Sequence, residues 1–460
     1  MEKPDLILVD ERDFYYPNLE FPRPMLWLYI FITRVLDALL WFEPDPQKLA
    51  IPLLSAYARD AGFKTEVVRD VANYFFKRRR FIKLLRLQPL AVGISTSALK
   101  KISTIKRVTA IVRRHSPGSL IILGGYGAQY SPEMRKAGDL TVTGYGEGAL
   151  VELLRRLKAD PGSALYAGVV ADSNGSKTLQ GSIYYPRQEK MLYPDWSVAP
   201  ARPRHYNIEA SRGCRFNCSY CNFPGRKKQV YRPVEDIVGE MAWAVDNFRA
   251  KEFDFVDSNL TSEPGFVSGL AGLLEKKGLK ARWRCFARVA DFAHYPGLAA
   301  EMGKAGCVRI FLGVESINDG ILAKMRKGYT FAEVEAGIAE IERSGVPMHA
   351  NFIIGFPGET AETVKETERF IKKHRFQSVY LSALMVPEEL YERARRDPAG
   401  LANLRGGSPR SWVHDTMDYR KAVRLAGSAA LRINLSKFRP VVFPLGTDLP
   451  DPDKDLLPPV

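Results

Sequence analysis

Short apolar segments alternate with amphipathic helical segments along most of this chain. Five apolar runs in the first 160 residues have the length of strands, namely residues 5–10, 65–70, 90–96, 119–125 and 140–148. Helical periodicity appears between or after them, at residues 49–61, 101–115 and 150–157. Strand–helix alternation is typical of a parallel sheet that carries helices on both faces. The pattern therefore predicts an α/β protein that begins with a doubly wound parallel sheet of the flavodoxin or Rossmann kind.

A second alternating stretch begins at Tyr206 and contains six apolar runs: IEASRG, FDFVDS, RWRCFAR, VRIFLGVES, MHANFIIGF and SVYLSALMV. Helical segments such as 234–248 and 361–373 lie between these runs, so we expect a partial (βα)6 barrel with its active site at the carboxyl ends of the strands. Asn174-Gly175 indicates a hairpin between the two stretches. We therefore divide the chain into a first domain (1–160), a hairpin and linker (161–205), the barrel (206–388), and a small C-terminal substrate-side segment with a tail (389–460).

Composition and charge exclude several classes of protein. Hydrophobic residues make up 46% and charged residues 26%, which is a globular balance, and the net charge is +15. The basic runs at 77–80 and 226–228 lack an aromatic RNA-binding pattern, so we do not favour a nucleic-acid partner. The apolar stretch at 25–42 contains two charges and is short for a bilayer span. We expect no membrane span and no cleavable signal peptide, although a membrane-facing patch at 25–42 stays open.

Three of the five cysteines crowd into one short segment, Cys214, Cys218 and Cys221, with the spacing C-x3-C-x2-C. Such crowding favours metal ligation in a reducing cytoplasm over disulfide formation. The segment directly follows the run IEASRG, so we expect it on the loop at the carboxyl end of a strand. Zinc would require a fourth nearby ligand, and the only close histidine is His205. Three thiolates instead suit a [4Fe–4S] cluster that keeps one iron without a cysteine.

The cysteine segment, with Tyr220 before its last cysteine, resembles the motif of the radical S-adenosylmethionine (SAM) superfamily. The resemblance covers about residues 206–376 and implies that SAM chelates the fourth iron and is cleaved to a 5′-deoxyadenosyl radical. It also implies a set of SAM contacts at the ends of the strands. These are Tyr220, Ser258, Asn259, Arg288, Glu315, Ser316, Asn351, Ile353 and Gly355. No Gly-Gly-Glu stands at the second strand, which leaves the amino-group contact at Ser258 and Asn259 open.

The first domain resembles the cobalamin-binding domain that often precedes such a barrel. Ser97-Ala98-Leu99 fits the S-x-L motif, Gly124-Gly125 fits its glycine pair, and 144–148 fits the next glycine-rich loop. The resemblance implies a corrinoid site built from the strand ends, comprising Ser95, Thr96, Ser97, Leu99, Gly124, Gly125, Tyr126, Gly144, Gly146, Glu147 and Gly148. The usual D-x-H-x-x-G motif is missing, and no histidine precedes His115. We therefore expect cobalamin without a histidine ligand from this region.

Together these features predict a cobalamin-dependent radical SAM enzyme with three cofactors: a [4Fe–4S] cluster, SAM and cobalamin. A C-methyltransferase acting on an organic substrate is favoured. A cyclase or rearrangement enzyme of the same kind, or a non-catalytic corrinoid carrier or sensor, is the alternative. A tRNA methylthiotransferase would need three further cysteines before Cys214, and the sequence has none.

The expected partners are a small-molecule or peptide substrate and an electron donor such as a flavodoxin or ferredoxin. Trp412 and His414 form a polar–aromatic group after the barrel that is a candidate substrate contact. The alternative is that the tryptophan packs in the core and the histidine caps a helix.

Overall fold

The computed structural model describes residues 2–11, 49–72, 74–97, 102–160, 168–171, 175–182, 191–199, 205–221, 223, 227–386, 388–396, 401, 403–406, 410–436 and 441–445. The apolar stretch 25–42, Leu99 and the C-terminal tail lie outside these residues. The chain divides into two compact units, with the boundary between Pro203 and Arg204. Among the described residues, none of the helices combines the length and apolar character needed to cross a membrane.

The sheet of the first unit has the strand order β2-β1-β3-β4-β5-β7-β6. Its first five strands run parallel, and they are β1 (Leu6–Asp10), β2 (Thr65–Arg69), β3 (Ala91–Ser95), β4 (Leu120–Gly124) and β5 (Leu140–Thr143). This 2-1-3-4-5 order is the flavodoxin-like doubly wound order, so the predicted fold class is confirmed. The antiparallel pair of β6 (Val169–Ala171) and β7 (Lys177–Gln180) extends the sheet beside β5.

Helices cover both faces of this first sheet, and each face has its own apolar core. The helices are α2 (Ala50–Asp60), α3 (Phe75–Leu85), α4 (Ile102–His115), α5 (Tyr126–Tyr130), α6 (Pro132–Arg135) and α7 (Glu147–Ala159). The fifth run was predicted to extend to 148, but β5 ends at Thr143. Gly144 has φ +74°, a conformation that leaves the strand, and α7 begins three residues later. The basic run 77–80 lies within α3.

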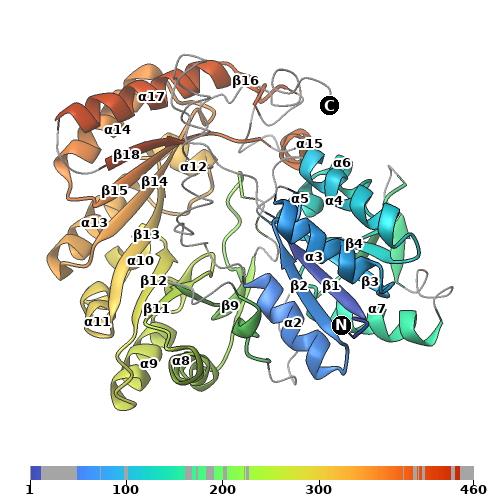
Figure 1. Ribbon diagram of the computed structural model, residues 1–460. Coiled ribbons are helices and arrows are strands. Elements are labelled where there is room, and N and C mark those ends of the chain that lie inside the picture. The colour runs from blue at the N-terminus through green and yellow to red at the C-terminus, as the bar shows by residue number, and fades with distance from the viewer. Residues whose placement is uncertain are drawn as a thin grey trace. The chain divides into compact units, whose positions relative to one another are not determined.

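The second unit contains a fully parallel sheet of order β18-β15-β14-β13-β12-β11-β8 (Figure 1). All six predicted strands are present, as β8 (Tyr206–Ile208), β11 (Glu252–Phe255), β12 (Arg282–Ala287), β13 (Cys307–Glu315), β14 (Met348–Ile354) and β15 (Ser378–Ala383). The seventh, β18 (Val441–Leu445), joins β15 in parallel. The C-terminal segment therefore contributes a strand to this sheet.

The helices of the second unit are α8 (Val234–Phe248), α9 (Pro264–Lys276), α10 (Val289–His294), α11 (Leu298–Lys304), α12 (Asp319–Lys324), α13 (Phe331–Ser344), α14 (Ala361–Lys373), α15 (Glu388–Arg396) and α17 (Tyr419–Ser436). Most of them lie on one side of the sheet, whereas α15 lies apart from that layer (Figure 1). Short elements complete the unit: the antiparallel pairs β9 (Ser211–Cys214) with β10 (Lys228–Tyr231) and β16 (Val413–His414) with β17 (Met417–Asp418), and the 3-10 turn η2 (Leu260–Ser262). A second 3-10 turn, η1 (Trp196–Val198), belongs to the first unit.

The run IEASRG is not one strand, as the sequence predicted. β8 ends at Ile208, and a separate strand β9 begins at Ser211 and pairs with β10. The break is held by buried Asp257, whose carboxylate accepts hydrogen bonds from Ala210 N and Ser211 Oγ. Cys214 is consequently the last residue of a β-hairpin strand, and the loop that carries the other two cysteines continues from it.

Candidate functional site

The cysteine loop carries its three thiols within eight residues, and all three side chains are half-buried. The amide of Phe223 donates to Cys221 Sγ at 3.3 Å, which suits a sulfur that carries negative charge. Among the described residues, no three His, Cys, Asp or Glu side chains converge on a single-ion site. In a [4Fe–4S] cluster, each of the three thiolates binds a different iron.

The loop is fixed from two sides by other parts of the second unit. Ser219 donates through its amide to Met325 O (3.0 Å) and through Oγ to Lys324 O (2.9 Å), at the end of α12. Arg393 of α15 donates Nη1 to the carbonyls of Ser219 (3.2 Å) and Cys221 (2.8 Å). These backbone contacts hold the thiols in place without engaging them. No sequence pattern predicts this role for Arg393, because an arginine on a highly charged helix is normally a solvated side chain.

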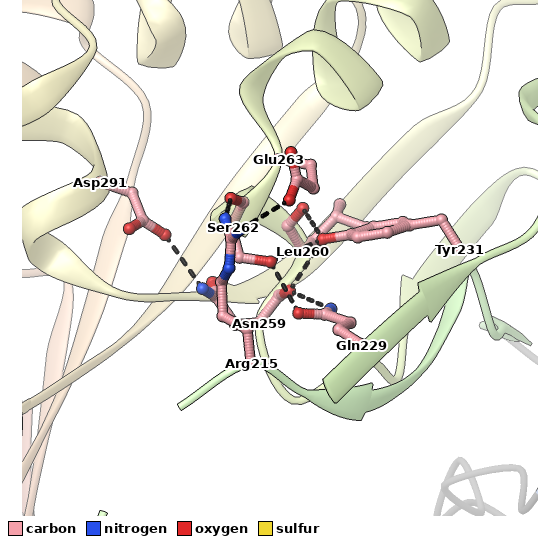
Figure 2. A network of polar contacts seen from close by, with 8 residues as sticks. All are labelled: Arg215, Gln229, Tyr231, Asn259, Leu260, Ser262, Glu263 and Asp291. Carbon is pink, nitrogen blue, oxygen red and sulfur yellow. Dashed lines mark hydrogen bonds and ion pairs between the residues drawn. The ribbon is translucent and has the colours of Figure 1, made fainter. Parts of the chain in front are cut away.

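A polar network ties the start of the same loop to the segment after β11, as Figure 2 shows. Arg215, next to Cys214, donates Nη1 to Ser262 O at 2.6 Å and pairs with Glu263 at 3.0 Å. Gln229 and Tyr231 of β10 reach the same segment: Gln229 Nε2 donates to Asn259 O (2.9 Å), and Tyr231 Oη lies 2.8 Å from Ser262 Oγ. The β9–β10 hairpin is therefore joined to the carboxyl edge of the main sheet.

Glu315 stands in a β-bulge at the end of β13. The register with β14 shifts between Gly313 and Glu315, and Glu315 has φ +67°, a left-handed conformation that is strained for a residue with a side chain. Tyr220 Oη donates to Glu315 Oε1 at 3.1 Å, and Lys327 Nζ lies 3.7 Å from the same oxygen. Burial raises the pKa of Glu315, an effect that Lys327 opposes. The bulge thus directs a buried carboxylate toward the cysteine loop.

The carbonyl groups released by the bulge find partners from the segment after α12. Tyr329 Oη donates to Gly313 O and Val314 O at 3.0 and 3.1 Å, and Lys327 Nζ donates to Gly313 O at 3.0 Å. Lys327 is 4% exposed and Tyr329 6% exposed, so both are part of the interior. Sequence reasoning missed them, because a lysine in the run Arg326-Lys327-Gly328 reads as a surface charge.

Arg288 follows β12 and lies against the cysteine loop. Its guanidinium carbon is 3.4 Å from the ring centroid of Phe216 and 5.0 Å from that of Tyr329, and Nη2 donates to Lys327 O. Its Nε is buried and has no hydrogen-bond partner among the described residues. A cation with a free donor beside the cysteines fits an anionic ligand group such as the carboxylate of SAM.

Asn259 and Ser258 also stand at this edge, but their side chains are engaged within the protein. Asn259 Oδ1 accepts from Arg288 N (3.1 Å) and Thr261 Oγ1 (2.9 Å), and its Nδ2 donates to Asp291 at 3.0 Å. Ser258 Oγ donates to Gly213 O at 3.0 Å, and Ser316 Oγ accepts from Asn318 N. These contacts give the three residues a bracing role and provide no support for a ligand contact at Asn259.

The end of β14 forms another part of the edge. Asn351 and Ile353 are half-buried on the face that also carries Glu315, and Gly355 has φ +91° where the strand turns away. A Cβ at Gly355 would lie 2.5 Å from the ring of Trp412, so only glycine fits there. Gly355 N donates to the buried carboxyl of Glu359, whose burial raises its pKa to about 8. This turn is therefore closed by a carboxyl group that stays protonated near neutral pH.

Trp412 and His414 lie behind this turn, in the interior of the unit. They are 1% and 4% exposed and stack with ring centroids 5.2 Å apart. Trp412 Nε1 donates to Leu384 O at 2.7 Å, and His414 Nε2 lies 3.0 Å from Gly355 O. Thr416 N donates to His414 Nδ1 at 3.4 Å, so the histidine is neutral with its proton on Nε2. These contacts favour the packing role of the pair over a substrate contact.

In the first unit, the predicted corrinoid residues gather at the carboxyl ends of three neighbouring strands. Ser95 ends β3 and pairs in register with Gly124 at the end of β4, which pairs with Val142 of β5. Ser95 Oγ is buried and without a hydrogen-bond partner in the described part of the chain. Beside Gly124, a Cβ would meet nothing closer than 3.8 Å. An orphaned hydroxyl beside open space fits a bound polar ligand.

Other members of this set have structural reasons for their identity. A Cβ at Gly125 would lie 2.4 Å from Ser97 Oγ, and one at Gly144 would lie 2.9 Å from Ser182 O. Thr96 Oγ1 donates to Gly124 O and accepts from Ala128 N, both at 2.8 Å. The remaining members lie at the same edge: Tyr126 is 47% exposed at the start of α5, and Gly146, Glu147 and Gly148 open α7.

The two units match two family models in chain order. Residues 37–154 match the B12 binding domain, and residues 208–371 match the radical SAM superfamily. The flavodoxin-like sheet and the cysteine loop beside a parallel barrel sheet are the structural counterparts of these matches. The chain belongs to the cobalamin-dependent radical SAM enzyme family, in which a B12-binding domain precedes a radical SAM domain.

Curated relatives are distant. The chain is 25% identical over 303 residues to the uncharacterized methyltransferase PH0819 of Pyrococcus horikoshii, covering 63% of this chain and 65% of that protein. It is 28% identical to the bacteriochlorophyllide d C-12(1)-methyltransferase of Chlorobaculum tepidum, over 45% and 48%. It is 24% identical to the anaerobic magnesium-protoporphyrin IX monomethyl ester cyclase of Rubrivivax gelatinosus, over 70% and 61%. The matched part of the chain thus spans between about half and just under two thirds of the length of these relatives.

Two solved structures share the fold over most of the chain. The radical SAM methyltransferase TsrM of Kitasatospora setae, with cobalamin and a [4Fe–4S] cluster bound, matches with a TM-score of 0.61 and 18% identity, over 83% of this chain and 75% of that one. The cobalamin-dependent SAM radical enzyme OxsB, with aqua-cobalamin and SAM bound, matches with a TM-score of 0.63 and 21% identity, over 89% and 57%. The cofactors of this family are a [4Fe–4S] cluster, SAM and cobalamin.

Proposed function

We propose that this protein is a cobalamin-dependent radical SAM C-methyltransferase. The observation that supports it most is the braced cysteine loop with Arg288, Glu315 and Tyr220 beside it, in one chain with a cobalamin-type sheet. When bound, the cofactors supply a reducible cluster, a source of an organic radical and a methyl carrier. Two relatives named as methyltransferases favour methylation over other outcomes.

Each assigned residue has a role that follows from its environment. Cys214, Cys218 and Cys221 hold the cluster, and the free Nε of Arg288 binds the carboxylate of SAM. Asn351, Ile353 and the turn at Gly355 provide a half-buried surface for its adenine. Ser95 and the glycines at the ends of β4 and β5 hold the cobalamin tail. The substrate and an electron donor, such as a flavodoxin or ferredoxin, complete the system, and a reducing cytoplasm keeps the thiols available.

Ring closure or rearrangement is the second candidate, because the cyclase of Rubrivivax gelatinosus matches over 70% of this chain. The two outcomes differ in the fate of the methyl group of SAM. Anaerobic reconstitution with SAM carrying a deuterated methyl group, followed by mass spectrometry of candidate substrates, distinguishes them. A product heavier by the labelled methyl group supports methylation, while product formation without label supports the cyclase.

The cluster assignment is tested first. Replacing Cys214, Cys218 and Cys221 together by Ala removes iron and SAM cleavage, whereas Cys285→Ser and Cys307→Ser, in buried strand positions, retain both. About four irons per chain in the triple variant would overturn the assignment and with it the proposed enzyme. A colourless, iron-free wild-type protein after anaerobic reconstitution would instead favour a corrinoid carrier or sensor.

A further inference from the structure

The sheet of the second unit has one covered face and one open face. Along β12, Trp283, Cys285 and Ala287 are buried, while Arg284 is half-buried and Phe286 is 44% exposed. The same alternation runs along the neighbouring strands, with half-buried positions at Asn207, Asp254, Phe311, Asn351, Tyr380 and Ser382. Parallel sheets are normally covered on both faces, so an open face carrying large side chains indicates a ligand surface.

Four aromatic side chains stand next to one another on this side of the sheet, one from each of β12, β13, β14 and β15, and His349 among them is buried. Ring centroids are 5.1 Å apart for Phe286 and Phe311, 5.1 Å for Phe311 and His349, and 4.4 Å for His349 and Tyr380. We call these four residues the aromatic ridge. Four strands span three spacings of about 4.8 Å, so the ridge is roughly 14 Å long.

The ridge is too long for a single small ring and suits an extended apolar ligand. Aromatic side chains bind planar conjugated systems through stacked and edge-to-face contacts, which add to the gain from burying apolar area. Phe286 lies two residues before Arg288, which follows β12, and two residues of a strand span about 7 Å. The Phe286 end of the ridge therefore lies near the edge that carries the cysteine loop, whereas Arg309 lines a hollow with residues at the amino ends of the strands, such as His205 and Gln377.

A charged side chain, Arg309, stands beside the ridge and forms no ion pair with a described residue, although the carboxylates of Asp254 and Glu252 lie near enough to act on its charge. Arg309 lies two residues before Phe311 on β13, and its guanidinium carbon is 6.0 Å from the ring centroid of Phe311. Its neighbour in register, Arg284, is neutralised by Asp254 through bonds of 2.6 and 2.5 Å. Arg309 has no hydrogen bond or ion pair to any described residue, and its Nε is buried. An unpaired guanidinium in this position is suited to binding a carboxylate in bidentate fashion.

A second polar group in the ridge also lacks a partner. His349 is 3% exposed, and its Nδ1 is bonded to Ser378 Oγ. Its Nε2 is buried and has no hydrogen-bond partner within the described residues. Burial and the charge of Arg309 lower the pKa of His349 to about 4, so the ring is neutral near pH 7. Buried polar atoms of this kind are normally satisfied, and a ligand group would satisfy this one.

We propose that the open face binds the substrate of the reaction, and that this substrate is a planar conjugated ring system carrying at least one carboxylate. The aromatic ridge contacts the ring system, and Arg309 binds the carboxylate. This inference rests on the proposed function, because only that function makes the ligand a substrate. The binding chemistry itself is independent of the reaction.

Equilibrium dialysis of the full-length holoprotein against protoporphyrin IX tests the proposal, with free probe measured by its fluorescence. Protoporphyrin IX is planar and carries two carboxylates, and its dimethyl ester keeps the ring and removes both charges. The wild-type protein should bind the acid about tenfold more tightly than the ester. Arg309→Gln should abolish that preference, and Phe286→Leu should weaken binding of both probes.

Matched controls separate this site from nonspecific adsorption. Arg369→Gln removes an exposed arginine of α14, and Phe76→Leu removes a phenylalanine of α3 that is 80% exposed. Neither should change the affinity for either probe. Equal affinity of the wild-type protein for acid and ester overturns the proposal, as does unchanged binding in both Arg309→Gln and Phe286→Leu.

The methyl-transfer experiment distinguishes failure of this inference from failure of the proposed function. Transfer of the labelled methyl group to a non-planar or uncharged substrate overturns the inference and leaves the function in place. Selective loss of probe binding in Arg309→Gln, in a protein that cleaves no SAM, supports the binding surface and overturns the function.

Discussion

The hydroxyl of Tyr220 donates a 3.1 Å hydrogen bond to the carboxylate of Glu315, joining the cysteine loop to the bulge at the end of β13. The two residues are 95 positions apart in the sequence. Both side chains lie in the interior, and burial raises the pKa of each. The backbone of Glu315 is strained, and its side chain is held by this hydrogen bond and by the nearby Lys327 ammonium. These contacts offset the energetic cost of the strained conformation.

Tyr220→Phe tests that relationship. The substitution removes one donor to a buried carboxylate, which should lower the free energy of unfolding by about 1–3 kcal/mol. Iron content should be unchanged, because the three thiols and their backbone contacts remain. Denaturant unfolding of the reconstituted protein and iron analysis measure the two effects. An unfolding free energy equal to that of the wild-type protein would contradict the structural role of the bond.

Glu359 should make the stability of the protein depend on pH. Its pKa of about 8 lies above the ordinary value of 4.5, so between these values the folded state holds a proton that the unfolded state has lost. The stabilisation is complete below pH 4.5 and is lost as the pH rises toward 8. Relative to Glu359→Gln, the free energy of unfolding of the wild-type protein should fall by about 1.4 kcal/mol per pH unit in this window. A difference in unfolding free energy between the wild-type protein and Glu359→Gln that stays the same at all pH values would refute this expectation.

His414→Ala should destabilise the protein without changing the chemistry of a folded sample. The variant loses the bond to Gly355 O and the stacking on Trp412. A loss of about 1–3 kcal/mol is expected for such a buried group, together with a lower Tm. SAM cleavage without substrate, measured at low temperature, should match the wild-type rate. A variant of unchanged Tm that fails only in substrate turnover would restore the substrate-contact interpretation.

Gly124→Leu should weaken cobalamin binding while leaving the fold intact. A Cβ at Gly124 meets only Val142 O at 3.8 Å, so the protein without cobalamin has room for the leucine side chain. That side chain would then occupy space that the bound corrinoid needs. Gly118→Leu is the matched control, since it also faces open space but precedes β4 at the opposite edge of the sheet. Thermal melting and a cobalamin titration by absorbance measure both effects. Equal affinity in the two variants would argue against a corrinoid at Gly124.

Bound cobalamin should carry no histidine nitrogen from the first unit. The first histidine in the sequence, His115, ends α4 just before β4, on the edge opposite Ser95 and Gly124. The 14 residues of α4 separate the two edges by about 20 Å. The electron paramagnetic resonance spectrum of the Co(II) form should therefore lack nitrogen superhyperfine splitting. A resolved axial-nitrogen pattern would disprove this prediction.

The sequence by itself determined the fold class and predicts the cluster ligands. Alternating apolar and amphipathic segments are local patterns, and they predicted β1 to β5 of the first sheet and six of the seven strands of the second. The spacing of Cys214, Cys218 and Cys221 is equally local, because three thiolates on one loop define a cluster site without reference to distant residues. Four of the five predicted strands of the first domain end within a residue of the prediction, whereas β5 ends at Thr143 instead of 148.

The tertiary structure alone decided which distant side chains meet at those ends. The hydrogen bonds that join Tyr220 to Glu315 and to Lys327 span 95 and 107 residues, and the bond from Arg393 to Cys221 O spans 172. The sequence left Trp412 and His414 open between a substrate contact and a packing role, and only their positions behind Gly355 favour packing. The aromatic ridge was hidden for the same reason. Its four members occupy one position on each of four separate strands. The register of the sheet aligns Phe286, Phe311 and His349, and it places Tyr380 diagonally across from His349.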